Sequence, residues 1–152
     1  MATGVTHAGL KVSISTDQPP TYDAAGFADV GVTYTEIKQV ISVGDQGREY
    51  ADVQTKVLGE RGTVHSKGTF DQGQFQMTLL DLTSDPGQVL LNAGADGASV
   101  DVNHTFKVEY NNAEIFYFQA LVLSYKIIGG DGDTNRTAQS TLVLDTRGTV
   151  KA

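Results

Sequence analysis

The chain has 152 residues, 39% hydrophobic and 19% charged, which suits a single domain that buries a core of its own. The absence of cysteine excludes disulfides, thiolate metal ligands and cysteine nucleophiles. The formal net charge is −7, with acidic residues spread along the chain and no basic patch, which excludes a nucleic-acid-binding protein. With 17 glycines, 3 prolines and no tryptophan, the composition favours short strands joined by turns.

The first nine residues have neither the basic start nor the apolar run of a secretory signal. No segment approaches the ~20 consecutive apolar residues that a membrane span needs. We therefore expect a soluble product without membrane segments that starts in the cytoplasm.

The first predicted strand covers residues 10–16, where apolar and polar side chains alternate as in a half-buried strand. Pro19 and Pro20 end it, because proline cannot donate to a sheet ladder. Residues 21–31 show too little periodicity for an assignment. A short strand at residues 30–32 is expected to lead into a strand at residues 33–43, which are rich in β-branched and aromatic side chains.

A long connection separates residues 33–43 from the next strand-like stretch, residues 63–70. It has about twenty residues, and connections of that length are usually functional loops or disordered segments. We interpret it as an arm that reaches a neighbouring subunit, and a solvated, mobile loop is the alternative. Residues 63–70 are predicted to form a hairpin with residues 74–81 across the turn at Asp71, Gln72 and Gly73.

The clearest helix signal follows this hairpin. Asp85 can cap the helix, Pro86 fits its first position, and Gln88 has the spacing of a capping box. Gly94 is a plausible stop, so the helix has about two or three turns. A helix this short is marginal in water, so we expect Leu90 and its neighbours to pack against the sheet.

Three further strands are predicted in the last third of the chain. Residues 98–110 alternate without a break and form a long strand with one wet face. Residues 114–128 are apolar on both faces, so this strand is either central in the sheet or covered by another subunit. A flexible loop at residues 129–133 precedes a final strand at residues 138–145, and residues 146–152 trail off.

Signals for catalysis, cofactors or metals are weak. His7, His65 and His104 lie far apart in the sequence, and His104 falls in the apolar row of its strand, as a core histidine does. The chain has no nucleophile elbow, no phosphate-binding loop and no dinucleotide-binding motif. The segment from Asp131 to Asn135 begins like a calcium loop but lacks the turn glycine and the bidentate acid. We expect no enzyme and no cofactor.

The order of these features resembles the major tail tube proteins of long-tailed, siphovirus-like bacteriophages. The resemblance covers residues 10–146, and its most specific pieces are Gly47-Arg48-Glu49-Tyr50 and Asp85-Pro86-Gly87-Gln88. It implies a single domain, mainly β: an antiparallel β-sandwich or open barrel with one short flanking helix and a long inter-strand loop. It also implies six-membered rings that stack into a hollow tube between phage head and tip.

The resemblance assigns roles to particular residues. The loop matching residues 43–58 reaches the adjacent ring, with the contact residues Asp45, Gln46, Gly47, Arg48, Glu49, Tyr50 and Asp52. A sheet from each subunit lines the lumen, and Asp101, Glu109 and Glu114 are the candidate acids of a negative wall that keeps DNA from sticking.

The resemblance also implies partners and a location. These are other copies of the chain, a tape-measure protein, and terminator and tip proteins, in a virion tail assembled in the host bacterial cytoplasm. DNA passes through without specific binding, and no membrane is involved. Two alternatives stay open: a carbohydrate-binding β-sandwich module, and a tube subunit like that of type VI secretion.

Overall fold

The computed structural model describes residues 4–96 and 101–152. Among these residues the chain forms ten strands and two short helices, so the mainly β fold class expected from the sequence is confirmed. In chain order the elements are β1 (Lys11–Ser15), α1 (Ala24–Phe27), β2 (Thr35–Ile37), β3 (Val40–Val43), β4 (Glu49–Lys56), β5 (Thr63–Asp71), β6 (Gln74–Leu80), α2 (Pro86–Gly94), β7 (His104–Glu109), β8 (Ile115–Ile128), β9 (Thr137–Leu144) and β10 (Val150–Lys151).

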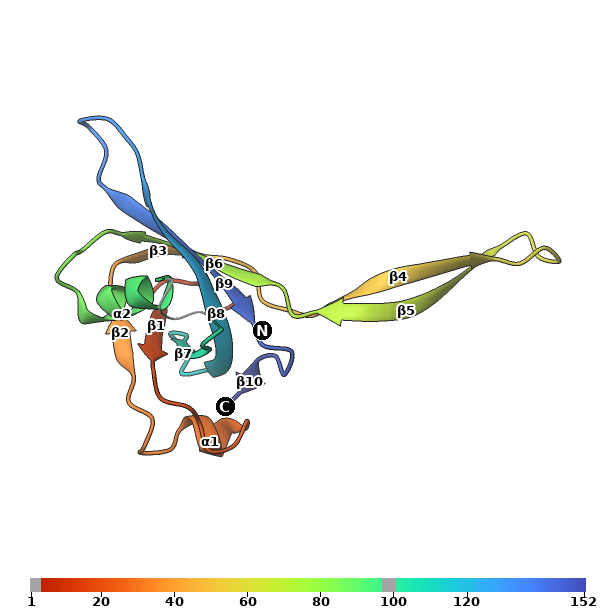
Figure 1. Ribbon diagram of the computed structural model, residues 1–152, viewed down its shortest axis with the longest axis horizontal. Coiled ribbons are helices and arrows are strands. Elements are labelled where there is room, and N and C mark those ends of the chain that lie inside the picture. Colours follow the sequence, from red (N-terminus) through yellow and green to blue (C-terminus); the bar gives the residue numbers. More distant parts are fainter. Residues whose placement is uncertain (1–3, 97–100) are drawn as a thin grey trace.

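The body of the molecule is one antiparallel sheet that rolls into an open barrel (Figure 1). Its strands follow the order β2-β1-β7-β8-β9-β6-β3, so the two edge strands are neighbours in the sequence. Only Lys38 and Gln39 separate β2 from β3, which brings the two edges of the sheet close together. The Leu80 N–H donates to the main-chain oxygen of Gln39 (2.9 Å) and holds this junction against the end of β6.

The junction also corrects the single strand predicted at residues 33–43. Gln39 has a φ of 61°, in the left-handed region that breaks a sheet ladder. The segment therefore divides into β2, which pairs with β1, and β3, which pairs with β6. Both halves are rich in β-branched residues, so composition does not reveal the break, and a register shift between Val40 and Ser42 further interrupts the second half.

The core lies inside the barrel and is built from alternate residues of each strand. Phe118 is at its centre, with ring centroids 5.5 Å from Phe75 and 5.4 Å from Phe106. Fifteen buried hydrophobic residues form one cluster: Val12, Ile14, Ile37, Phe75, Met77, Leu79, Leu91, Phe106, Val108, Phe118, Ala120, Val122, Ala138, Leu142 and Leu144. One connected core supports the single domain that the composition suggested.

Helix α2 packs against β1, β2 and β8 on the core side, as expected from its short length. The Asp85 carboxylate accepts from the N–H of Gln88 (3.1 Å) and of Lys38 (3.2 Å). Leu91 is fully buried and Leu90 packs partly against the core. A Cβ on Gly87 would lie 2.2 Å from the Glu36 oxygen, so only glycine lets the helix approach β2 this closely.

Helix α1 lies on the other side of the sheet and was not predicted. Asp23 caps it by accepting from the Gly26 N–H (2.7 Å). Its Phe27 is fully buried and stacks on Tyr117 of β8, with ring centroids 5.4 Å apart. Four residues are too few to show a helical period. The strand expected at residues 30–32 does not form, and Val30 is fully exposed.

The last third of the chain also differs from the sequence pattern. The strand predicted at residues 98–110 begins only at His104, while residues 98–100 lie outside the described part of the chain. Asp101 has a φ of 58° and lies in a turn before the strand. The tail expected to trail off instead forms β10, where Val150 pairs with Tyr117 and Lys151 with Phe116.

Candidate assembly surfaces

Strands β4 and β5 form a separate two-stranded sheet that projects from the barrel as an arm (Figure 1). All residues of β4 are exposed, and on β5 only Gly68 is partly buried. The eight residues of β4 span roughly 26 Å at the usual rise of a strand. The long connection predicted to be an arm therefore projects from the body, as a hairpin rather than a loop.

The pairing of β5 corrects the predicted hairpin between residues 63–70 and 74–81. Strand β5 pairs with β4, from Glu49 opposite Asp71 to Lys56 opposite Thr63. Strand β6 pairs with β9 and β3 instead. The turn at residues 71–73 thus joins the arm to the barrel, and β4 lies where the sequence suggested an unpaired loop.

The two faces of the arm differ in chemistry. On the polar face, His65 Nδ1 lies 2.8 Å from Asp52 Oδ2, and Gln54 donates to the same oxygen (3.1 Å). The opposite face carries small and apolar side chains: Ala51, Val53, Thr55, Val57, Val64 and Ser66. Val53 and Val64 are 48% and 45% exposed. Nothing in the described part of the chain covers this apolar face, and isolated two-stranded hairpins are marginally stable in water.

Aromatic and cationic side chains pack together at the base of the arm. Arg48 donates to the Tyr50 hydroxyl (3.2 Å), and this bond lowers the pKa of Tyr50. The Arg48 guanidinium lies 4.8 Å from the centre of the Phe70 ring, and Lys67 Nζ lies 4.9 Å from that of Tyr50. These contacts fix the conformation in which the arm leaves the barrel.

The structure distributes the seven predicted contact residues along the lower half of the arm. Asp45, Gln46, Gly47 and Arg48 form the connection from β3, and Glu49, Tyr50 and Asp52 lie in β4. The predicted contact residues leave out the arm's tip at residues 57–62, which carries a fully exposed Leu58, although the loop predicted to reach the adjacent ring extended to residue 58. The signal was present in the sequence: Val57 and Leu58 stand directly before Gly59, an unusual place for two apolar residues.

The three candidate lumen acids lie apart. Asp101 is in the turn before β7, at the opposite end of that strand from Glu109. Glu109 is paired across the sheet with Lys11 and Ile115. Glu114 precedes β8 and forms an ion pair with Lys151 Nζ (3.1 Å), which lowers its pKa. Their predicted lumen position remains a prediction, and two of the three have lysine neighbours.

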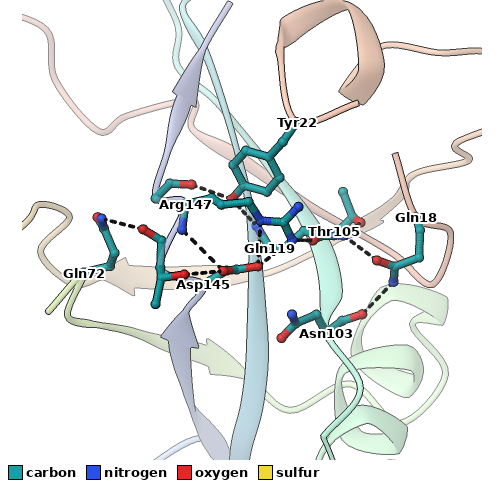
Figure 2. Close-up of polar contacts among 10 residues, drawn as sticks. Gln18, Tyr22, Gln72, Asn103, Thr105, Gln119, Asp145 and Arg147 are labelled. Carbon is teal, nitrogen blue, oxygen red and sulfur yellow. Dashed lines mark hydrogen bonds and ion pairs between the residues drawn. The ribbon is translucent and has the colours of Figure 1, made fainter. Parts of the chain in front are cut away.

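A polar network fastens the carboxyl-terminal segment to the barrel and was not predicted (Figure 2). Arg147 donates to Gln119 Oε1 (2.8 Å), and Gln119 is buried in the middle of β8. The Tyr22 hydroxyl donates to the main-chain oxygen of Gly148 (2.5 Å). Burial raises the pKa of Asp145, but its hydrogen bonds from Arg147 outweigh burial, and the pKa lies below its usual value.

One of the three histidines lies within the barrel. His104 is buried as predicted, and burial lowers its pKa. Across residues 4–96 and 101–152, no group of three or more histidines and acids could hold a metal ion. In the same residues no helix is long and apolar enough to cross a membrane.

Comparison with known proteins identifies the fold. No protein-family model and no curated protein matches the chain in sequence. Solved structures do match. A chain from the sheath/tube terminator of the extracellular contractile injection system PVC has a TM-score of 0.69 at 10% identity, covering 100% of this chain and 99% of that one.

Two further matches extend the same result. A chain from the anti-feeding prophage baseplate has a TM-score of 0.64 at 12% identity, covering 100% of this chain and 97% of that one. A chain of the SPP1 tail tube has a TM-score of 0.59 at 12% identity, covering 97% and 78%. The protein therefore has the fold found in phage tails and contractile injection systems, in agreement with the resemblance seen in the sequence.

Proposed function

We propose that this protein is a structural tail tube subunit, which assembles with copies of itself into rings that stack as a hollow tube. The β4–β5 arm is the observation that carries the proposal. It is a hairpin too exposed to be stabilised by its own barrel, with an apolar face that has no partner within the described chain. A second copy of the chain supplies such a partner in a ring or a stack. The fold supports this proposal, because similar chains come from a tail tube and a sheath/tube terminator.

The proposal includes the exposed half of β8. A register shift between Val122 and Ser124 interrupts the pairing with β9, and Leu123, Ile127 and Ile128 beyond it are 54%, 58% and 41% exposed. The first half of the strand is buried centrally in the sheet. Residues 115–122 are central in the sheet, and in this proposal the exposed apolar side chains of residues 123–128 contact a neighbouring subunit.

In this proposal the tube belongs to a virion tail, assembles in the host cytoplasm and guides DNA without catalysis. A tape-measure protein and terminator or tip proteins are the further expected partners. A secretion tube would use the same assembly and differ in cargo. For a carbohydrate-binding module, the exposed aromatic side chains Tyr50 and Phe70 make a poor stacking platform, because their planes are 52° apart and cations cover both.

Electron microscopy of the purified protein across a concentration series tests the proposal. We expect rings or tubes of uniform width. A variant in which a short Gly-Ser linker replaces residues 50–70 should keep the circular dichroism of a folded barrel and lose stacking, since Glu49 and Asp71 already pair at the point of closure. Normal tubes from the linker variant would overturn the role of the arm, and dispersed monomers of the full chain at every concentration would overturn the proposed function.

A further inference from the structure

One broad surface of the barrel consists mainly of uncharged polar side chains. It is the outer side of β3, β6, β9 and the second half of β8, where neighbouring strands align Gln74 with Val143, Gln76 with Thr141 and Thr78 with Gln139. We name it the amide-hydroxyl face and define it by its polar members: Ser42, Gln74, Gln76, Thr78, Ser124, Gln139 and Thr141. The residues between them, such as Phe75, Met77 and Leu142, point into the core and are fully buried.

The amide-hydroxyl face is uncovered in the single chain. Ser42, Gln74 and Gln76 are exposed, and the other members are partly buried by their neighbours in the sheet. Helix α1 covers a different part of the outer side of the sheet, over Tyr117 of β8. Helix α2 lies on the core side of the sheet. In Figure 1 both helices lie on the other side of β3 and β6 from this face. The face is therefore available as a wall.

Its lack of charge is unusual for this chain. The net charge is −7, yet no carboxylate lies on the ladder positions of the face, and Lys126, opposite Gln139, is its single cation. Apolar residues border it, Leu121 and Val143 at one end and Leu80 and Ile128 at the other. Acids lie elsewhere: Asp29 follows α1, Glu60 is in the arm's tip, and Asp131 and Asp133 are in the β8–β9 loop.

The composition of the face can be compared with that of three kinds of surface: one that binds or repels a polyanion by charge, an interface between subunits, and the exterior of a particle. A surface for binding a polyanion carries lysine and arginine, and one that repels it carries acids. An interface between subunits has an apolar or aromatic centre, whereas the centre of this face is glutamine, threonine and serine. The exterior of a soluble particle usually mixes charges of both signs, whereas this face has one lysine and no carboxylate on its ladder positions.

We propose that the amide-hydroxyl face lines the lumen of the assembled tube, where it is a wall without carboxylates, with Lys126 as its only charge, for a passing polyanion. The inference rests on the proposed function, because a lumen exists only in the assembly. It differs from the acidic wall predicted at Asp101, Glu109 and Glu114. Amide and hydroxyl side chains hold a layer of water by hydrogen bonding. The polyanion therefore meets mostly water rather than fixed charges, and it exchanges few counterions as it moves.

Cysteine labelling of assembled tubes tests the position of the face, since the natural chain has no cysteine. Gln76→Cys and Thr141→Cys place a thiol near its centre, Glu109→Cys reports on the acidic candidate, and Asp133→Cys reports on the β8–β9 loop. Each variant is treated with N-ethylmaleimide and with a 20-kDa polyethylene glycol maleimide, as monomer and as tube. For Gln76→Cys and Thr141→Cys we expect the small reagent to react in both states, and the large one to react at least tenfold more slowly in tubes.

The outcomes separate the inference from the proposed function. If no ring or tube forms, both fail. If tubes form and both reagents modify Gln76→Cys at the monomer rate, the face is exterior. If neither reagent reacts, the face is an interface between subunits. Either result overturns the lumen position and leaves tube assembly intact, and exclusion of the large reagent at Glu109→Cys alone would favour the acidic wall.

A charge substitution tests the low charge of the wall in the same tubes. Wild-type tubes are incubated with a fluorescent oligonucleotide. At any salt concentration, the amount that they retain should not exceed the amount dissolved in the volume that the tubes occupy. Gln76→Lys tubes should retain several-fold more at low salt and lose it as salt rises. Salt-sensitive retention by the wild type as strong as that of Gln76→Lys would contradict a wall with so little charge.

Discussion

The guanidinium carbon of Arg147 lies 4.2 Å from the centre of the Tyr22 ring, so the two ends of the chain meet at one cation–π contact. The same guanidinium donates to Asp145 Oδ2 (2.6 Å) and to the side chain of the buried Gln119. Residues far apart in sequence thus fasten the last turn of the chain to β8 (Figure 2). Strand β10 contributes only two ladder residues, so most of the attachment depends on this network.

Replacing Arg147 with alanine should therefore destabilise the domain. The variant loses the cation–π contact and leaves the Gln119 oxygen without its donor, which together cost about 1–3 kcal/mol in the free energy of unfolding. Urea denaturation measures the change. Arg147→Lys keeps a cation but not the planar fork and should fall between wild type and alanine. An alanine variant as stable as wild type would show that β10 holds the segment unaided.

The buried Gln88 should be among the most sensitive positions of the fold. Its amide donates to the main-chain oxygens of Lys38 (2.9 Å) and Leu80 (2.8 Å), and its oxygen accepts from the Leu82 N–H (2.8 Å). Gln88→Ala leaves these groups unpaired and opens a cavity, which should lower the free energy of unfolding by about 2–4 kcal/mol. The control Val89→Ala, on the exposed side of α2, should change it by less than about 0.5 kcal/mol. Equal effects at both positions would contradict this role.

Charges placed on the apolar face of the arm should impair assembly without unfolding the barrel. Val53→Asp and Val64→Asp alter a face that has nothing covering it in the single chain, so monomer stability should change by less than about 0.5 kcal/mol. Burying the new carboxylate against a second copy is unfavourable, so the concentration needed for assembly should rise at least tenfold in sedimentation velocity. The matched control, Thr63→Asp on the polar face opposite Lys56, should assemble more nearly as wild type does. Equal loss in all three would show that the apolar face is not the contact.

Local chemistry made some elements predictable. The start of α2 follows from Asp85 and Pro86, whose effects act within one turn, and its end was predicted at Gly94; both ends were correct. The capping-box return expected of Gln88 was wrong, because its side chain binds main-chain groups of Lys38, Leu80 and Leu82 instead. Alternation located β1 and β9 within one or two residues, since each has one core face.

Strand partners were not predictable from periodicity. Residues 63–70 alternate equally well against β4 or β6, and the structure selects β4. Alternation also continued through residues 98–103, although Asp101 has a backbone conformation that no strand tolerates. The amide-hydroxyl face was hidden for the same reason: Gln76 and Thr141 become neighbours only when β6 pairs with β9.

The buried His104 should make stability depend on pH below neutrality. Burial lowers its pKa in the folded protein, so the folded state stays unprotonated at a pH where the unfolded chain, with a pKa near the usual ~6.5, takes up a proton. The free energy of unfolding should therefore fall as pH decreases below about 6.5, with a slope of at most about 1.4 kcal/mol per pH unit from this group. His104→Gln should remove that part of the slope between pH 7 and 5. His65→Gln, in the exposed arm, is the control for histidine removal in general. The same pH slope in wild type and in His104→Gln would show that His104 is not the group that titrates.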